Sequence, residues 1–236
     1  MAITLDLSQL QESTGVHFND KAILQRSLTH PSYRNEHPTQ NLQDNERLEF
    51  LGDAVLDFIS GEWLYARYPE GSEGYLTRLR AALVRTETLA DFSIQFSLDR
   101  ALLLGRGEEE HGGRQRAGNL CAAFEAFVGA IYLDQGIQRV RELVFPHFEE
   151  ALQTILQYDL DKDPKSLLQE WSQAHMGLTP SYRTINSQGP DHAKLFTVAV
   201  YVGNKCYGKG SGPNKQTAAQ SAAQQALEML QSPPPS

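Results

Sequence analysis

The sequence is poor in several residue types, and each shortage excludes a class of protein. Its 236 residues include two cysteines, Cys121 and Cys206, with no C-x-x-C pair. A disulfide framework or a structural zinc site is therefore not expected, and both cysteines are interpreted as small core residues. The first residues, Met1 to Asp6, lack the basic and apolar regions of a signal peptide, and no apolar run is long enough to suggest a spanning segment. We expect a cytoplasmic protein with no membrane partner.

Lysine is scarce in most of the chain, since one lysine, Lys21, precedes position 162. Residues 1–161 hold 14 basic and 25 acidic residues, a net charge of -11, whereas residues 162–236 hold 7 and 4, a net charge of +3. Although the whole chain carries -8, the second part is the place to expect a surface that contacts phosphates.

A change in hydrophobic period divides the chain into two domains. Up to about Tyr158 the apolar residues recur with helical spacing, so the first domain, 1–157, is predicted to be all-α. A polar linker over 158–163, a second domain over 164–231 and a disordered Ser-Pro tail over 232–236 follow. Helices of the first domain are expected near residues 7–15, 20–28, 45–68, 73–97, 119–135 and 137–157.

Alternating apolar residues appear in the second domain, after Gly177. The pattern predicts the order α-β-β-β-α, with Gly203 and Asn204 in a tight hairpin turn. The expected elements are a helix over 165–176, strands over 181–185 and 196–202, a strand that starts at 205, and a helix over 215–230.

The glycines of the second domain resemble a nucleotide-binding loop, but one position disagrees. Residues 203–210 read G-x-x-x-x-G-K-G, and Gly210 replaces the Ser or Thr that would hold Mg²⁺. Nucleotide binding is therefore not expected. We interpret 210–215 as a loop that presents backbone N–H groups and Lys215 to a phosphate at a helix N-terminus.

The most informative stretch of the first domain is 45–58, NERLEFLGDAVLDF. On an α-helix Glu46, Glu49 and Asp53 fall within about 60° of one another, apart from an apolar stripe. Crowded carboxylates repel unless a cation compensates them, and hard oxygen ligands suit Mg²⁺ or Mn²⁺. A solvated acidic face would show the same spacing, but apolar residues on more than one side favour a covered helix and hence a metal site.

Two more acidic residues could join this group. Glu125 is the only charged residue in 120–131, and a lone carboxylate in such an apolar helix requires a partner. Glu73 opens another predicted helix, where capping is the alternative role. By contrast, His30 and Tyr33 at the end of the second helix are expected to pack and hydrogen-bond, and 108–111 to form a solvated loop.

The stretch 45–58 resembles the signature of bacterial-type ribonuclease III, the double-stranded-RNA endonuclease. The resemblance covers roughly residues 7–230, and implies an all-α endonuclease domain followed by an α-β-β-β-α double-stranded-RNA-binding domain. The supporting matches are LTHPSY at 28–33, PEGSEGYLTRLRAALV at 69–84, GGR at 112–114, FEAFVGAIYLD at 124–134, DPKSLLQEW at 163–171, GPDHAKLFTV at 189–198 and GSGPNKQTAAQSAAQQAL at 210–227.

For the first domain the resemblance implies catalysis that depends on Mg²⁺, with Mn²⁺ as a substitute. Glu49, Asp53 and Glu125 would bind the metal, and the catalytic set would be Glu46, Asp53, Glu73 and Glu125. The implied activity is staggered cleavage of double-stranded RNA, of the kind that processes rRNA and mRNA precursors, leaving 5′-phosphate and 3′-hydroxyl ends.

The resemblance also implies two kinds of partner. A homodimer would form through the signature helix, with Phe50 as a buried contact, although from the residues alone Phe50 could be ordinary core. Double-stranded RNA would be recognised through 2′-hydroxyls and phosphates across two minor grooves. The implied RNA-binding residues are Ser166, Gln169, Glu170, His192 and Lys215.

One carboxylate of the family pattern is missing. Three residues before Glu125 the family carries an Asp, and this sequence has Ala122. Residues i and i+3 share a helix face, so the change removes a metal ligand directly. The alternative to an active endonuclease is therefore a homologue that binds double-stranded RNA with reduced or no cleavage.

Overall fold

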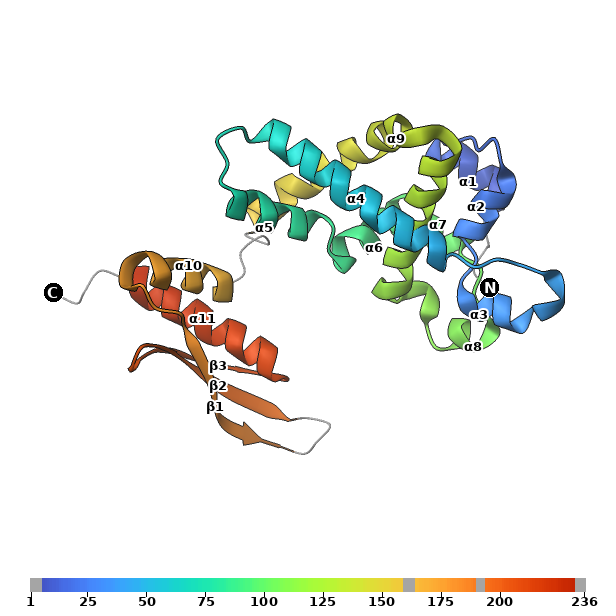
Figure 1. The fold of residues 1–236 in the computed structure, drawn as a ribbon. Helices are drawn as coiled ribbons and strands as arrows, with labels where there is room; N and C mark the ends of the chain where they lie inside the picture. Colours follow the sequence, from blue (N-terminus) through green and yellow to red (C-terminus); the bar gives the residue numbers. More distant parts are fainter. Residues whose placement is uncertain (1–5, 159–163, 190–193, 232–236) are drawn as a thin grey trace. The chain divides into compact units, whose positions relative to one another are not determined.

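The computed structural model describes residues 6–158, 164–189 and 194–231. The chain divides into two compact units, Met1–Asp161 and Lys162–Ser236. Most of the predicted linker and the whole predicted tail, 232–236, lie outside the described residues. The longer helices of the first unit are α1 (Leu7–Thr14), α2 (Lys21–Ser27), α3 (Pro31–Glu36), α4 (Glu46–Arg67), α5 (Glu73–Leu83), α6 (Thr86–Gln95) and α9 (Ala117–Gln157), with the short α7 (Leu98–Ala101) and α8 (Arg106–Glu110) between them (Figure 1).

The two long helices α4 and α9 cross at the centre of the first unit (Figure 1). They touch backbone to backbone at two glycines. A Cβ on Gly52 would lie 1.7 Å from the main-chain oxygen of Glu125, and one on Gly129 would lie 2.3 Å from that of Leu48. The fully buried rings of Phe124 and Phe127 add to the core beside the crossing. The glycine pair thus fixes which residues of α4 face α9.

Helix α9 contains the predicted break between its two halves. Gly136 has φ 82° and ψ 175°, a conformation that favours glycine. Just before it, the Asp134 carboxylate accepts hydrogen bonds from the N–H groups of Asn19 (2.9 Å) and Asp20 (3.0 Å). By length and composition α9 could cross a membrane, but more than half of its most apolar stretch is buried inside this unit, as in the core helix of a globular domain.

The prediction of one helix over 73–97 is wrong, because the chain turns a corner between α5 and α6. Arg85 is extended, with φ -69° and ψ 156°. The Thr88 hydroxyl reaches back across the corner and donates to the Ala82 carbonyl at 2.9 Å. The corner lets α6 pack against α9, a tertiary contact that the helical period alone does not encode.

Two short helices form where the sequence predicted a helix end and a solvated loop. Residues 29–33 do not only end the second helix: α3 begins at Pro31, and the His30 ring nitrogen Nδ1 accepts from the Ser32 N–H as its N-cap. Residues 108–111 are not a free loop, since α8 forms there. Glu108 and Glu109 are paired with Arg116 and Arg114, which lie farther along the chain.

The second unit has the predicted order α-β-β-β-α, with α10 (Pro164–Met176), β1 (Ser181–Gln188), β2 (Leu195–Val202), β3 (Lys205–Gly212) and α11 (Lys215–Gln231). The strands form an antiparallel sheet in the order β1-β2-β3, and α10 and α11 lie together on one face (Figure 1). A bulge in β1 falls between Thr184 and Asn186. The hairpin turn is at Gly203, with φ 61°, as predicted.

Strand β3 extends farther than predicted, because part of the expected loop 210–215 is strand. Its alternate glycines, Gly208, Gly210 and Gly212, face α11. A Cβ on Gly208 would lie 2.4 Å from the Ala222 oxygen, and one on Gly210 would lie 2.2 Å from the Ala222 nitrogen. The glycines are therefore needed for helix α11 to lie directly on the backbone of the sheet.

Candidate catalytic site

The predicted carboxylates of α4 meet α9 at the helix crossing. Glu46 is the first residue of α4 and is exposed, Glu49 is half-buried, and Asp53 follows one turn later and is exposed. Glu125 is half-buried on α9, and its own main-chain oxygen is the atom that packs against Gly52. The contact at Gly52 therefore places Glu125 near Glu49 and Asp53, as predicted from the sequence.

The carboxylates of this group influence one another electrostatically. The pKa of Glu125 is raised to about 7, chiefly by burial and also by the charges of Asp53 and Glu49, against a lowering by a hydrogen bond from Cys121. Burial also raises the pKa of Glu49, followed by the charges of Glu46 and Asp53. Among the described residues, no cationic side chain contributes to either shift. The site thus concentrates negative charge without a protein counter-charge.

The donor set fits a hard divalent cation, because carboxylate oxygens are the ligands that Mg²⁺ and Mn²⁺ prefer. Within the described ranges, no three Asp, Glu, His or Cys side chains converge closely enough to enclose a metal ion. Glu49, Asp53 and Glu125 therefore lie near one another on two crossing helices without forming a closed metal site. Mg²⁺ usually keeps several of its waters, so a closed protein cage is not required.

Ala122 occupies the position at which the family pattern has an Asp. It is half-buried like Glu125, while Ala123 and Phe124 between them are fully buried. Ala122 and Glu125 therefore share the partly open face of α9, as the i, i+3 spacing predicted. The methyl group of Ala122 offers no oxygen to a metal.

Glu73 is not brought to the other carboxylates within one chain. It is the exposed first residue of α5, where its carboxylate accepts from the Thr77 hydroxyl at 3.0 Å. It lines a pocket with Gly61 and Leu64 of α4. Gly61 is eight residues beyond Asp53, about 12 Å along the helix axis. A catalytic role for Glu73 stays a prediction.

One residue beside the site was missed by sequence reasoning. Cys121 is buried in the core, as predicted, but its thiol lies 3.5 Å from the Oε1 atom of Glu125. The signal was present in the sequence, because residues i and i+4 of a helix are neighbours. A cysteine one turn before a lone buried carboxylate was a candidate partner for it.

The predicted RNA-binding residues that the structure describes are all exposed on the second unit. Ser166, Gln169 and Glu170 lie on α10. Lys215 is the first residue of α11, whose start is capped by the Asn214 side chain accepting from the Thr217 N–H at 2.8 Å. His192 lies outside the described residues.

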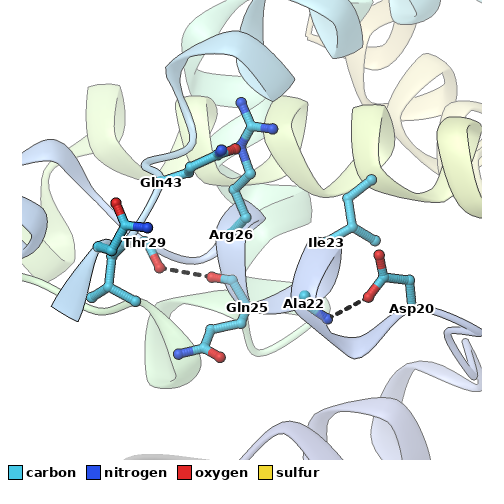
Figure 2. A pocket seen from close by; sticks show the side chains of 9 residues that line it. Asp20, Ala22, Ile23, Gln25, Arg26, Thr29 and Gln43 are labelled. Atoms are coloured by element: carbon cyan, nitrogen blue, oxygen red, sulfur yellow. Dashed lines mark hydrogen bonds between the residues drawn. The ribbon is translucent and has the colours of Figure 1, made fainter.

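A separate pocket of about 430 Å³ lies between α2 and the segment before α4 (Figure 2). Three of its polar side chains, those of Asp20, Arg26 and Thr29, make hydrogen bonds within the fold. Asp20 accepts from the Ala22 N–H at 2.8 Å, and the Thr29 hydroxyl donates to the Gln25 carbonyl at 2.8 Å, as the dashed lines in Figure 2 show. The Arg26 Nε donates to the Asp44 carbonyl at 3.1 Å. The pocket offers no carboxylate pair like that of the helix crossing.

The first unit is thus a helical domain with grouped carboxylates, and the second is a small α-β-β-β-α domain. Residues 20–151 match the family model Ribonuclease-III-like, and residues 164–230 match the Double-stranded RNA binding motif. The chain belongs to the ribonuclease III family, and it is an endoribonuclease that acts on double-stranded RNA.

Relatives match over nearly the full length. The chain is 44% identical over 227 residues to Ribonuclease 3 of Roseiflexus sp. (strain RS-1), covering 95% of this chain and 96% of the relative. It is 44% identical over 236 residues to Ribonuclease 3 of Pediococcus pentosaceus, covering 98% of each.

Solved structures match the first unit. The nuclease domain of ribonuclease III from Campylobacter jejuni is 36% identical, with a TM-score of 0.56, covering 61% of this chain and 95% of that one. A second structure of that domain, which concerns structural flexibility in a region involved in dimer formation, has a TM-score of 0.57 at 36% identity and covers 62% and 98%.

Proposed function

We propose that this endoribonuclease cleaves double-stranded RNA with Mg²⁺ bound by Glu49, Asp53 and Glu125. The observation that carries the proposal is the Glu125 carboxylate, which is half-buried at the helix crossing beside two other carboxylates, with its pKa raised to about 7. A bound cation would stabilise the ionised form of a half-buried carboxylate whose pKa is raised in this way. The alternative of a homologue that binds without cutting is not favoured, because the relatives that match over nearly the full length are Ribonuclease 3 proteins and Glu49, Asp53 and Glu125 are present.

Within this proposal the protein residues have distinct tasks. Glu49 and Glu125 supply oxygens from the half-buried side, and Asp53 and Glu46 supply charge from the open side. A bound Mg²⁺ would supply Lewis-acid stabilisation of the phosphate and activation of water, with 5′-phosphate and 3′-hydroxyl ends as the products. The proposed substrates are duplex regions of rRNA and mRNA precursors in the cytoplasm, with Mn²⁺ as a substitute metal.

We further propose that the active form is a two-fold homodimer built on α4. The Phe50 side chain is 79% exposed, so it is not a core residue of the single chain. An open apolar groove of about 470 Å³ lies between α4 and α9, lined by residues that include Ala54, Phe58 and Tyr132. In an isologous dimer the Phe50 of each chain can enter the groove of the other. The two sites would then act on opposite strands and give staggered cuts.

The metal proposal is tested by single-turnover cleavage of an end-labelled RNA duplex over a range of Mg²⁺ concentrations. Asp53→Asn should lower the rate by orders of magnitude. The matched control is Asp57→Asn, an exposed carboxylate one turn farther along the same helix, which does not contribute to the pKa shifts of the site. Equal rates for the two variants, or cleavage that persists in chelator, would refute the proposal.

The dimer proposal is tested by sedimentation at micromolar concentration. Phe50→Ala should shift the protein towards monomer and convert staggered double cuts into single nicks. Ile94→Ala, which truncates another exposed apolar side chain on α6, should leave the mass unchanged. A parent protein that sediments as a monomer would rule out paired cuts by one assembly.

A further inference from the structure

Glu125 has a hydrogen-bond donor at its buried end. The Cys121 Sγ lies 3.5 Å from Glu125 Oε1, within the range for a sulfur donor, one helical turn away on α9. The Cys121 side chain is 9% exposed and belongs to the hydrophobic core. Among the described residues it is the one side chain that hydrogen-bonds to this carboxylate.

The Cys121 thiol is the donor in this contact, and the Glu125 carboxylate is the acceptor. Burial keeps the pKa of the thiol at about 12, so Cys121 remains a neutral donor under working conditions.

We propose that Cys121 is a positioning residue for Glu125, which holds one carboxylate oxygen so that the other is presented to the metal. This inference rests on the proposed metal role of Glu125. Ala122, the neighbour on the open face, has no polar atom that could restrain the carboxylate. A ligand whose rotamer is fixed by its surroundings loses less side-chain freedom when it binds. The thiol therefore favours the metal-binding arrangement before the metal arrives.

The decisive comparison is between Cys121→Ala, which removes the donor, and Cys121→Ser, which keeps a hydroxyl donor of similar shape. Cys121→Ala should raise the Mg²⁺ concentration for half-maximal cleavage by about three- to tenfold, the size expected for one net hydrogen bond. The rate at saturating Mg²⁺ should change little, and Cys121→Ser should restore the metal dependence. Cys206→Ala, at the other free cysteine, is the matched control and should match the parent.

A spectroscopic readout separates the hydrogen bond from general packing. In a Cys206→Ala background the Cys121 S–H stretch should be the remaining thiol band in the infrared spectrum. Glu125→Ala should move that band to higher frequency, because the acceptor is lost. Urea unfolding of each variant establishes that it is folded at the assay temperature.

The outcomes distinguish this inference from the proposed function. If folded Cys121→Ala has the Mg²⁺ dependence of the parent, or if the S–H band is the same with and without Glu125, Cys121 does not position the carboxylate. If Cys121→Ser shows the same weakened metal dependence as Cys121→Ala, packing and not the donor is responsible, and the proposal is overturned. Cleavage by the parent that is independent of Mg²⁺ would instead refute the metal site, while the S–H band would still decide the hydrogen bond.

Discussion

Gly52 of α4 lies against the main-chain oxygen of Glu125 in α9, so closely that a Cβ at position 52 would be 1.7 Å from it. The neighbouring Asp53 is a predicted metal ligand, and Glu125 is another. A glycine therefore sets the distance between two predicted ligands that are 72 positions apart in the chain. Any side chain at position 52 must push the two helices, and with them the carboxylates, apart.

Gly52→Ala is expected to damage both stability and cleavage. The extra methyl group meets backbone, which cannot rotate away, so the free energy of unfolding should fall by at least about 1–3 kcal/mol. Urea unfolding measures the stability. Gly61→Ala on the same helix is the control, because its Cβ would meet nothing closer than the Arg80 Cδ at 4.0 Å. That change should stabilise the protein by about 0.5–1 kcal/mol through helix propensity. A Gly52→Ala protein as stable as Gly61→Ala would contradict the described crossing.

Ala122→Asp is expected to lower the Mg²⁺ concentration for half-maximal cleavage, because it restores an oxygen ligand on the face of Glu125. RNA binding should be nearly unchanged, since the second domain supplies much of it. Single-turnover cleavage against Mg²⁺ and a separate duplex-binding assay check the two parts. If metal dependence and rate both stay the same in a protein that cuts well, Ala122 is not at the metal, and the role of Glu125 must be revised too.

Glu125→Gln is expected to act in the opposite direction. It keeps the shape of the side chain but removes a charged ligand, so cleavage should fall by orders of magnitude at every Mg²⁺ concentration tested. Binding of the duplex should survive, which distinguishes a lost ligand from a misfolded protein. A variant that cleaves within a fewfold of the parent would exclude Glu125 from the site.

The stability of the metal-free protein should depend on pH through Glu125. Its pKa is about 7 when folded and 4.5 ordinarily, so the folded state binds the proton more tightly. This contribution is complete below the ordinary pKa and is lost as pH rises through about 7. In chelator, the unfolding temperature of the parent should therefore fall relative to that of Glu125→Gln between pH 5 and 8. Added Mg²⁺ should restore more stability at pH 8 than at pH 5.

Two histidines titrate in the same range with the opposite sign. Burial lowers the pKa of His30 and of His147, so each favours the folded state as pH rises through 6.5. Both are present in the parent and in Glu125→Gln, and their effects cancel in the difference between the two proteins. A difference that is flat with pH would show that Glu125 is not perturbed.

Lys215→Ala should weaken the binding of duplex RNA uniformly across sequences and reduce the slope of log affinity against log salt by about one unit, as for one phosphate contact. Binding to matched RNA and DNA duplexes at several salt concentrations measures the slope. The RNA should bind more tightly, through its 2′-hydroxyls.

Lys205→Ala is the matched control for Lys215. Lys205 opens β3 at the hairpin turn, and Gly212 ends that strand seven residues later, about 23 Å away and close in sequence to Lys215. Loss of the same charge at that end should leave the salt slope near that of the parent. Equal changes in both variants would indicate diffuse attraction and not a defined contact at Lys215.

Local patterns in the sequence were sufficient for the features that depend on local structure. The spacing of Glu46, Glu49 and Asp53 predicted their shared face, and the lone charge of Glu125 predicted that it would find a carboxylate partner. The break at Gly136 and the period-two strands were also confirmed. Each of these signals lies within one helix or strand, where periodicity carries the information.

The features that sequence reasoning missed depend on contacts between distant segments. The corner at Arg85 lets α6 pack on α9, and Glu108 and Glu109 of α8 pair with arginines that lie beyond the end of that helix. The separation of Glu73 from the other carboxylates depends on how α5 packs against α4. The start of the predicted loop 210–215 is strand, with α11 lying on Gly210. This contact cannot be predicted from the local sequence. None of these partners is adjacent in sequence, so propensity could not identify them.

The glycines of β3 have a consequence for the energetics of RNA binding. Gly208, Gly210 and Gly212 interlock with the backbone of α11, so the helix cannot slide along the sheet by a fraction of a turn without a clash. The first residue of that helix, Lys215, is consequently held at a constant separation from the sheet before any duplex is bound. A recognition surface whose spacing is rigid in the free protein loses little conformational entropy on association. Discrimination between A-form and B-form duplexes can then arise because the fixed separation between Lys215 and the sheet fits the groove of one form and cannot adjust to the groove of the other.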